Sequence, residues 1–453
     1  MKKRILFTAS RFFPYAYGGG EVYIASVASA LRTKGWDVLI ATLGVRQQKE
    51  RPFSVRHSVH NGVPVTAMCL HEEALTELEK YSETSEHHRS FIRSVIKDFK
   101  PSLLHVNGLA LPSLEVAQEL TIPAVITIHH SGVACPAGDL IRPDGSQCQY
   151  AEAPGVCIPC TSLRRQPQWY TGGIIGNIPR QVYEPFGRRT EHARSLPFVL
   201  RVIRYPWLVD RQIIHQKKIW ELAQHIVAPS QAIKRLLLRN GVDEKKIHIL
   251  PHGVNIPKQK PRRRRATLPV KFGYIGQIAY AKGVHLIFEA LAGLGDAANY
   301  EFHVFGEARS PEEKKYFQCL TEQYPRVSVK DHGYIPHERI HEAYEQVDAV
   351  IVPSLAYEAF CLVVHEAFGA RTPVIVARAG AMPELVHDGK NGFIFERNDA
   401  ASLSKVITTI IESPPVIEAM KKDIPAVKSF STYARELQRI YQTAVRQVTT
   451  GHQ

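Results

Sequence analysis

Short apolar runs alternate with amphipathic segments along most of the chain. Residues 5–9 and 101–106 are bounded by turn residues and are too short for helices, so they predict buried strands. Residues 21–34 and 111–120 place their apolar side chains at helical spacing. Strands that alternate with helices predict a parallel sheet covered by helices on both faces.

The second half of the chain repeats this pattern. Residues 270–275, 300–305 and 374–377 predict strands, and residues 401–412 predict a helix. The stretch 258–269 contains four consecutive arginines and has no apolar periodicity, which indicates an exposed linker. The chain is therefore expected to be an α/β protein with two doubly wound domains, at residues 1–252 and 270–428, joined by a linker at 253–269.

One predicted βαβ unit carries two glutamates after its first strand. Glu358 follows the predicted strand 349–352, and Glu366 lies eight residues on, roughly 12 Å along a helix at about 1.5 Å per residue. The backbone N–H groups between them can hold phosphate oxygens, and they belong to Ala359, Phe360, Cys361 and Leu362. Carboxylates on either side of a diphosphate site suit a nucleotide sugar. The alternative is that Glu358 caps the helix and Glu366 is a solvated helix residue.

This stretch resembles the Glu-x7-Glu motif of the retaining glycosyltransferases of family 4, which have the GT-B fold. The resemblance continues through residues 379–384 and 389–392. It implies two Rossmann-like domains that face a central cleft, and a last helix, at 429–453, that crosses back to the first domain. It also implies transfer of a sugar from a nucleotide-sugar donor to an acceptor hydroxyl, in polysaccharide or glycolipid biosynthesis. Glu366 would then hold the ribose hydroxyls and Glu358 the sugar hydroxyls.

The resemblance extends to the loop that binds the donor diphosphate. Lys282 matches one cation of the family's clamp, whereas Gln277 stands where an arginine is expected. A lysine before a helix is also suited to phosphate on general grounds. The donor-binding set implied by the family likeness is completed by Gly276, Tyr334 and Ile335. Neither a metal ion nor another cofactor is implied for the chemistry.

Two features of the first half belong to the same likeness. Gly19 and Gly20, before the helix 21–34, resemble the glycine-rich turn near the acceptor and the donor phosphates. His129 ends the predicted strand 124–128 and resembles the family's catalytic histidine, which would contact the sugar near the reacting carbon. A structural histidine remains the alternative reading for His129.

Four cysteines fall within one short segment that lacks clear periodicity. They are Cys135, Cys148, Cys157 and Cys160, and the last two form a C-x2-C pair. Four thiolates within reach of one another could bind a structural zinc ion. Loop thiols without a ligand are the alternative, and both readings stay open.

Residues 161–220 are strongly basic, with eleven Lys and Arg against three Asp and Glu. Aromatic side chains are interleaved with this charge, which predicts contact with an anionic membrane surface and a lipid-linked or oligosaccharide acceptor. The alternative is a solvated basic surface with its aromatic rings in the core. The formal net charge of +14 fits an acidic partner but does not choose among lipid, nucleic acid and anionic substrate.

Localisation and the competing functions follow from what the sequence lacks. No apolar stretch approaches the roughly 20 residues that cross a bilayer, and the basic start does not continue as a signal peptide, so a cytoplasmic or peripheral membrane enzyme is expected. A nucleotide-sugar 2-epimerase or a phosphorylase on the same fold is the second enzyme hypothesis. A nucleic-acid-binding protein with a metal knuckle is a third hypothesis, although no RNA-module motif or regular finger spacing accompanies the basic residues.

Overall fold

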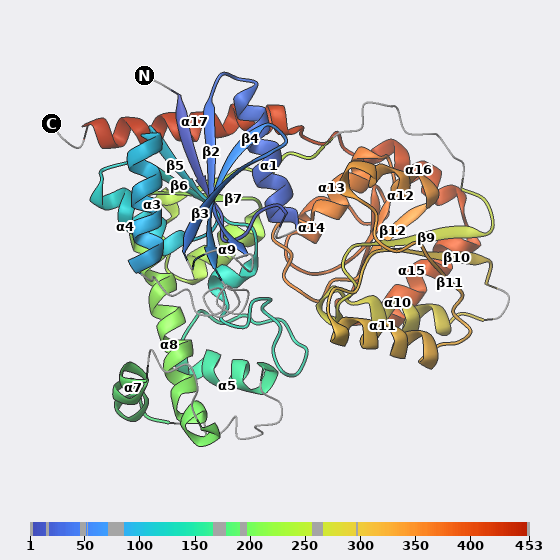
Figure 1. The fold of residues 1–453 in the computed structure, drawn as a ribbon. Helices are drawn as coiled ribbons and strands as arrows, with labels where there is room; N and C mark the ends of the chain where they lie inside the picture. The colour runs from blue at the N-terminus through green and yellow to red at the C-terminus, as the bar shows by residue number, and fades with distance from the viewer. Residues whose placement is uncertain are drawn as a thin grey trace. The chain divides into compact units, whose positions relative to one another are not determined.

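A computed structural model of the 453-residue chain describes residues 3–14, 18–45, 51, 53–70, 86–165, 178–190, 197–255, 266–295 and 298–450. The chain forms two compact units (Figure 1). Unit 1 comprises Met1–His252 together with Phe430–Gln453, and unit 2 comprises Gly253–Ser429.

Unit 1 is built on an eight-stranded sheet with the order β3-β4-β2-β1-β5-β6-β7-β8. Its neighbouring strands run parallel except β3 and β4, which form an antiparallel pair at one edge. The strands are β1 (Arg4–Thr8), β2 (Asp37–Val45), β3 (Ser54–His60), β4 (Val63–Leu70), β5 (Leu103–Val106), β6 (Ala124–Thr127), β7 (His225–Ala228) and β8 (Ile247–Ile249). The described helices are α1 (Gly19–Arg32), α3 (Glu86–Phe99), α4 (Ala110–Glu119), α5 (Pro154–Arg165), α7 (Arg180–Arg189), α8 (Phe198–Leu222), α9 (Gln231–Arg239) and α17 (Phe430–Thr450).

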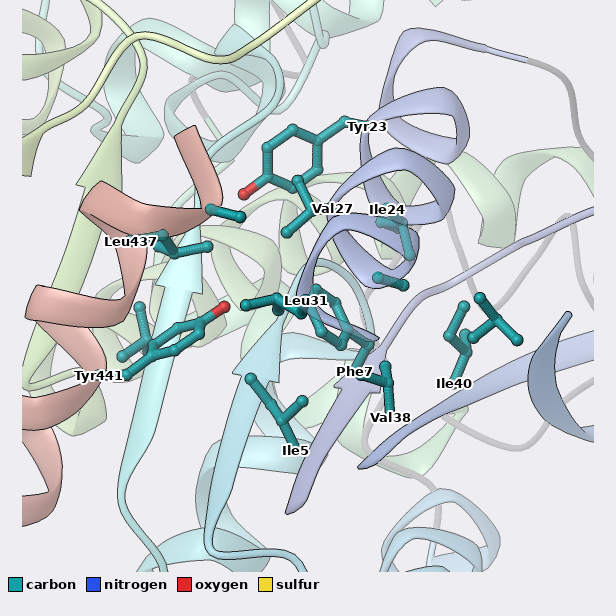
Figure 2. Close-up of a cluster of buried hydrophobic side chains, with 14 of the residues drawn as sticks. Ile5, Phe7, Tyr23, Ile24, Val27, Leu31, Val38, Ile40, Leu437 and Tyr441 are labelled. Carbon is teal, nitrogen blue, oxygen red and sulfur yellow. The ribbon is translucent and has the colours of Figure 1, made fainter. Parts of the chain in front are cut away.

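Helix α17, from the end of the chain, completes the core of unit 1. Leu31 of α1 and Leu437 and Tyr441 of α17 are buried in one cluster with the sheet residues Ile5 and Phe7 (Figure 2). Apolar side chains that recur along α17 at helical spacing present one continuous stripe to the sheet. The last helix is therefore an integral part of unit 1.

Buried polar groups within this core are paired with one another. The Tyr23 hydroxyl lies 2.7 Å from the Tyr433 hydroxyl. The His105 ring bonds through Nδ1 to the Tyr441 hydroxyl, at 2.6 Å, and through Nε2 to the Thr127 hydroxyl, at 2.7 Å. Because unpaired polar groups are costly away from water, this network fixes how α17 sits on α1 and the sheet.

Unit 2 has a six-stranded parallel sheet with the order β11-β10-β9-β12-β13-β14. The strands are β9 (Val270–Ile275), β10 (Tyr300–Phe305), β11 (Val329–Asp331), β12 (Ala349–Val352), β13 (Val374–Ala377) and β14 (Gly392–Phe395). The described helices are α10 (Val284–Ala292), α11 (Pro311–Gln323), α12 (His341–Gln346), α13 (Leu362–Gly369), α14 (Met382–Leu385), α15 (Ala400–Glu412) and α16 (Pro415–Asp423).

The predicted α/β class with parallel sheets is confirmed in both units. Described parts of the basic segment 161–220 form α7 and the long α8, for which the sequence analysis assigned no secondary structure. The arginines at 262–265 lie outside the described residues. No helix in the described parts of the chain is long and apolar enough to cross a membrane.

Removing a buried side chain from α17 should weaken unit 1. Leu437 is fully buried, so Leu437→Ala should lower the free energy of unfolding by about 2–5 kcal/mol through lost burial and the cavity left behind. Chemical denaturation followed by circular dichroism measures this loss. Arg439→Ala, at an exposed position of the same helix, is the matched control. Equal stability of both variants would contradict the role given to α17.

Candidate functional site

The loop between β12 and α13 carries Glu358 at the carboxyl end of the unit 2 sheet. Helix α13 begins at Leu362, after Cys361, which adopts a left-handed conformation with φ 58°. Glu358 therefore lies before the helix, so the spacing of roughly 12 Å along one helix, expected for the two acids, is wrong. Ala359, Phe360 and Cys361 form the approach to α13, and the positive end of the helix dipole lies at this segment.

Glu358 is held by two neighbours. Its Oε1 accepts hydrogen bonds from Lys282 Nζ, at 2.8 Å, and from Ser354 Oγ, at 2.6 Å. Burial opposes the charged carboxylate, but the Lys282 charge and these hydrogen bonds outweigh it and hold the pKa of Glu358 below its ordinary value. The same ion pair raises the pKa of Lys282. The structure thus brings two of the predicted donor-binding residues together as a charged pair.

Two glycines allow the loops at this end of the sheet to touch. A Cβ added at Gly283, where φ is +73°, would lie 2.0 Å from the Pro353 carbonyl oxygen. A Cβ at Gly380, where φ is +55°, would lie 2.3 Å from the Glu358 carbonyl oxygen. The N–H of Ala381 also donates to that oxygen, at 2.8 Å. Only glycine fits both the backbone conformation and the space at these two positions.

Glu366 lies on α13 and has partners that the sequence did not reveal. His337 Nε2 lies 2.8 Å from Glu366 Oε1, and the Tyr344 hydroxyl donates to Oε2 at 2.8 Å. Burial favours a neutral His337, but the hydrogen bond and charge of Glu366 outweigh it and raise the pKa of His337. His337 precedes Glu366 by 29 residues. No sequence-spacing rule relates residues that far apart, so the contact between His337 and Glu366 could be identified only from the structure.

The remaining predicted donor residues of unit 2 are arranged less uniformly. Gln277 Nε2 donates to Glu313 Oε1 at 2.6 Å, so α11 takes up the side chain that stands in place of the expected arginine. Gly276 has a φ of +146° and lies close to Gly306. A Cβ added at Gly306 would lie 2.0 Å from the Gly276 carbonyl oxygen. Tyr334 is exposed and Ile335 is half-buried, just beyond β11.

Unit 1 brings its own predicted residues together. Helix α1 begins at Gly19, two residues earlier than expected, and a Cβ on Gly20 would lie 3.9 Å from the His129 ring. His129 packs against the Tyr23 ring, with centroids 4.7 Å apart, and its Nε2 lies 2.9 Å from Asn107 Oδ1. Burial, with a smaller effect from neighbouring His130, lowers the pKa of His129 to about 3. His129 is therefore a neutral imidazole at physiological pH.

The zinc site expected at the four cysteines is not supported. Cys157 and Cys160 lie on helix α5 and not in a knuckle turn, and burial raises the pKa of Cys157 to about 12. Cys135 and Cys148 lie outside that helix. In the described part of the chain, no group of three or more His, Cys, Asp and Glu side chains is placed to hold a metal ion.

Three described aromatic residues of the basic segment are packed inside. Tyr183, Tyr205 and Trp207 are buried, so these rings are not available to contact a membrane and lie in the core, as the alternative reading expected. Gly187 of α7 touches the Trp207 ring, and Arg211 lies over that ring at 4.9 Å from its centroid. The segment is thus a helical subdomain with a basic surface and an aromatic interior.

Comparison with known proteins decides the family. The model of the "Glycosyl transferase 4-like domain" matches residues 18–156, that of "Glycosyltransferase Family 4" matches 177–258, and that of "Glycosyl transferases group 1" matches 255–428. This chain is a glycosyltransferase of the family 4 type. The predicted GT-B glycosyltransferase is therefore confirmed, and the epimerase, phosphorylase and nucleic-acid-binding hypotheses are set aside.

The curated relatives include glycosyltransferases, and the solved structures show the same fold. Glycogen synthase of Mycobacterium tuberculosis is 22% identical over 98% of this chain and 95% of its own length. A D-inositol 3-phosphate glycosyltransferase of Corynebacterium kroppenstedtii is 25% identical over 61% of this chain and 66% of its own. Sucrose-phosphate synthase from Thermosynechococcus elongatus superimposes with a TM-score of 0.66 at 18% identity, over 97% of this chain and 98% of its own. Anabaena HepE in complex with UDP and glucose gives 0.63 at 16% identity, over 98% and 100%.

The contact between Glu366 and His337 predicts a measurable titration. In Glu366→Gln the hydrogen-bonding carboxylate charge is lost while burial remains, so the pKa of His337 should fall from above its ordinary 6.5 to below it. Because the folded-state pKa is raised, the pair stabilises unit 2 below about pH 6.5, and this contribution is lost as pH rises through the folded pKa. Histidine ring NMR titration measures the shift. The His303 signal, whose partner is Glu301, should not move; a His337 pKa that stays above 6.5 would refute the assignment.

Proposed function

We propose that this glycosyltransferase moves a sugar from a nucleotide-sugar donor to an acceptor hydroxyl with retention at the anomeric carbon, in polysaccharide or glycolipid biosynthesis. The observation that carries the proposal is the Lys282–Glu358 ion pair at the carboxyl ends of β9 and β12, beside the start of α13. A cation, a carboxylate and a helix N-terminus together suit a diphosphate flanked by hydroxyls. The binding of UDP and glucose by HepE supports this choice of donor class.

The donor is assigned to unit 2 and the acceptor to unit 1. Glu366 would accept hydrogen bonds from the ribose hydroxyls, and Glu358 would accept hydrogen bonds from hydroxyls of the transferred sugar. Lys282 keeps 40% of its side chain exposed, so its ammonium can meet a phosphate oxygen while Glu358 remains its partner. When the bond from the anomeric carbon to the diphosphate oxygen breaks, its electron pair leaves with the diphosphate, and Lys282 and the α13 dipole stabilise that charge.

His129 is the proposed contribution of unit 1 to the reaction. Its pKa of about 3 leaves the ring uncharged, so the imidazole can exchange hydrogen bonds with hydroxyls without attracting the donor phosphates. Since Asn107 Oδ1 can only accept, Nε2 carries the ring proton and Nδ1 is the acceptor. A neutral histidine in this tautomer is suited to orient a hydroxyl group.

Replacing either acid of unit 2 should abolish most transfer. Glu358→Gln and Glu366→Gln remove charges aimed at the donor, so each should lower kcat/KM by about 100-fold or more. The rate is measured as release of the nucleoside diphosphate from UDP-, GDP- and ADP-sugars in the presence of a panel of acceptors. NMR of the first product gives its anomeric configuration. Glu322→Gln, at an exposed position of α11, is the control. Unchanged rates in both variants would refute the site, and an inverted product would refute retention.

We also propose that the basic surface of α7 and α8 contacts an anionic membrane that carries the acceptor. Arg188, Arg189 and Arg201 are exposed there, and exposed Val182 and Val199 lie on the same two helices. Each basic residue near an anionic surface contributes about 1 kcal/mol, and salt screens the attraction over about 10 Å at 0.1 M. Because the aromatic rings Tyr183, Tyr205 and Trp207 are buried, charge attraction would be the main contribution to membrane binding.

Liposome sedimentation tests the membrane proposal. The protein should sediment with anionic liposomes at low salt, be released at high salt and ignore neutral liposomes. Reversing Arg188, Arg189 and Arg201 to Glu should abolish sedimentation. The same reversal at exposed Lys314, Lys315 and Lys390 of unit 2 changes the net charge equally and should not. If both triple variants behave alike, the α7–α8 surface is not the membrane contact.

A further inference from the structure

A cavity of about 240 Å³ opens within unit 1 where strands β1, β5 and β6 end. Residues that follow these strands form one side of it, and helix α8 forms the other. The polar residues that line it include Ser10, Asn107, His129, Gln212, Gln216 and Trp220. His129 belongs to the proposed reaction, so the cavity is continuous with the part of unit 1 assigned to the acceptor.

The wall supplied by α8 is a regular stripe of polar groups. Gln212, Gln216 and Trp220 are spaced four residues apart, so they lie along one face of the helix. The indole of Trp220 is only 6% exposed, and its Nε1 has no acceptor among the described residues. The two glutamine amides are half-buried, and no side-chain hydrogen bond is formed by either within the described ranges. A buried N–H without an acceptor is costly unless a ligand or water completes it.

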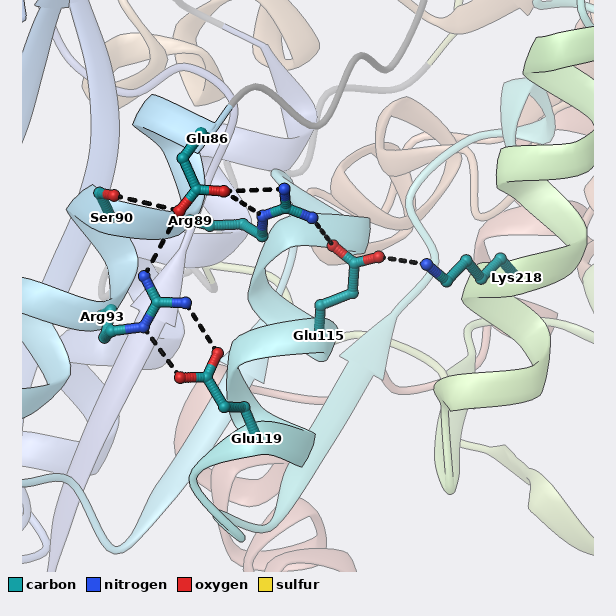
Figure 3. Close-up of polar contacts among 7 residues, drawn as sticks. All are labelled: Glu86, Arg89, Ser90, Arg93, Glu115, Glu119 and Lys218. Atoms are coloured by element: carbon teal, nitrogen blue, oxygen red, sulfur yellow. Dashed lines mark hydrogen bonds and ion pairs between the residues drawn. The ribbon is translucent and has the colours of Figure 1, made fainter.

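Helix α8 is fixed in place as this wall. Lys218 pairs with Glu115 of α4, and Arg89 of α3 donates to the same carboxylate at 3.3 Å (Figure 3). Ile213 and Val209, on another face of α8, pack in an apolar cluster with Ile158 of α5. Because separate faces of the helix are anchored, the stripe keeps a defined position against the strand ends.

The cavity lacks formal charge although the chain carries a net +14. None of the described residues that line it is Asp, Glu, Lys or Arg. Three described histidines line the cavity, His88, His129 and His130; burial lowers the pKa of His129 to about 3 and also lowers the pKa of His130, which favours the neutral form of both rings. A phosphate or carboxylate buried here would have no cation to pair with, which is strongly unfavourable.

We propose that this cavity binds an uncharged, hydroxyl-rich acceptor, a neutral sugar unit, and that Gln212, Gln216 and Trp220 select it. Amide groups both donate to and accept from hydroxyls, and the indole offers a flat apolar face together with an N–H donor. The volume is just below the roughly 300 Å³ at which pockets hold drug-sized ligands, so it suits one sugar unit. This inference rests on the proposed function and names the acceptor class of that site.

Matched acceptor pairs test the inference with the full-length protein. Diphosphate release from the best donor is measured with methyl glycosides and neutral disaccharides, and with their phosphorylated counterparts, including inositol phosphate beside inositol. Neutral acceptors should accelerate release at least about tenfold more than the phosphorylated partners, because a buried phosphate would lack a counter-ion. Preference for a phosphorylated partner would overturn the inference.

Variants of α8 test the selecting residues. Gln212→Glu and Gln216→Glu should each raise the acceptor KM about tenfold or more, because the new carboxylate loses solvation on acceptor binding and cannot donate. Trp220→Phe keeps a ring but removes the N–H, and should raise that KM about 3- to 10-fold with a smaller effect on kcat. Ile214→Glu puts the same charge at an exposed position of α8 outside the cavity and should leave KM unchanged. Equal KM values in wild type, Gln212→Glu and Trp220→Phe would overturn the assignment.

Failure of the inference can be told apart from failure of the proposed function. If no nucleotide sugar is bound or turned over, the proposed function is wrong. If donor is hydrolysed but neutral glycosides neither accelerate release nor give saturation-transfer NMR signals with the wild-type protein, only the acceptor assignment falls. Circular dichroism of each variant confirms folding, and the wild-type NMR measurement decides the matter even for a variant that does not fold.

Discussion

Close contact between backbone loops is the constraint on which the unit 2 site depends. The loop after β9 touches the loop after β12 at Gly283, and the loop after β13 touches it at Gly380. Leu355 and Ala356 also donate their N–H groups to the Ala281 carbonyl oxygen, at 2.9 and 3.1 Å. The backbone at Glu358 is therefore positioned by main-chain contacts with the loops after β9 and β13, and Lys282 and Ser354 orient its carboxylate.

The two acids of the candidate site each have side-chain partners within unit 2. Glu358 is paired with Lys282, and Glu366 with His337 and Tyr344. Lys282 and Ser354 keep the buried Glu358 ionised and oriented, and His337 and Tyr344 orient Glu366. In the proposed donor complex, the donor hydroxyls would therefore share carboxylate oxygens that already have hydrogen-bond partners. Recognition of a sugar then depends on hydrogen-bond geometry more than on net charge.

The sequence predicted several strands, but it did not predict every helix or the contacts between elements. The predicted strands 270–275 and 349–352 agree with β9 and β12, and residues 349–352 form the continuous apolar run expected of a strand buried on both faces. The start of α13 was misplaced because the left-handed Cys361 that precedes it is not a residue type that signals a helix boundary. Helix α8 was missed since Pro206 and the mixed basic and aromatic composition hide its period.

Unit 1 shows why net charge is a poor guide to the ligand of this protein. Several of its basic residues interact with other side chains: Lys218 pairs with Glu115, Arg93 pairs with Glu119, and Arg211 lies over the Trp207 ring. On the cavity side of α8, the same helix presents amides and an indole in place of charge. A helix that carries cations on one face and uncharged hydrogen-bonding groups on another can adjoin an anionic surface while it excludes anions from the cavity beside the strand ends. In the two proposals, one face of α8 would contact the membrane and another would line the acceptor cavity.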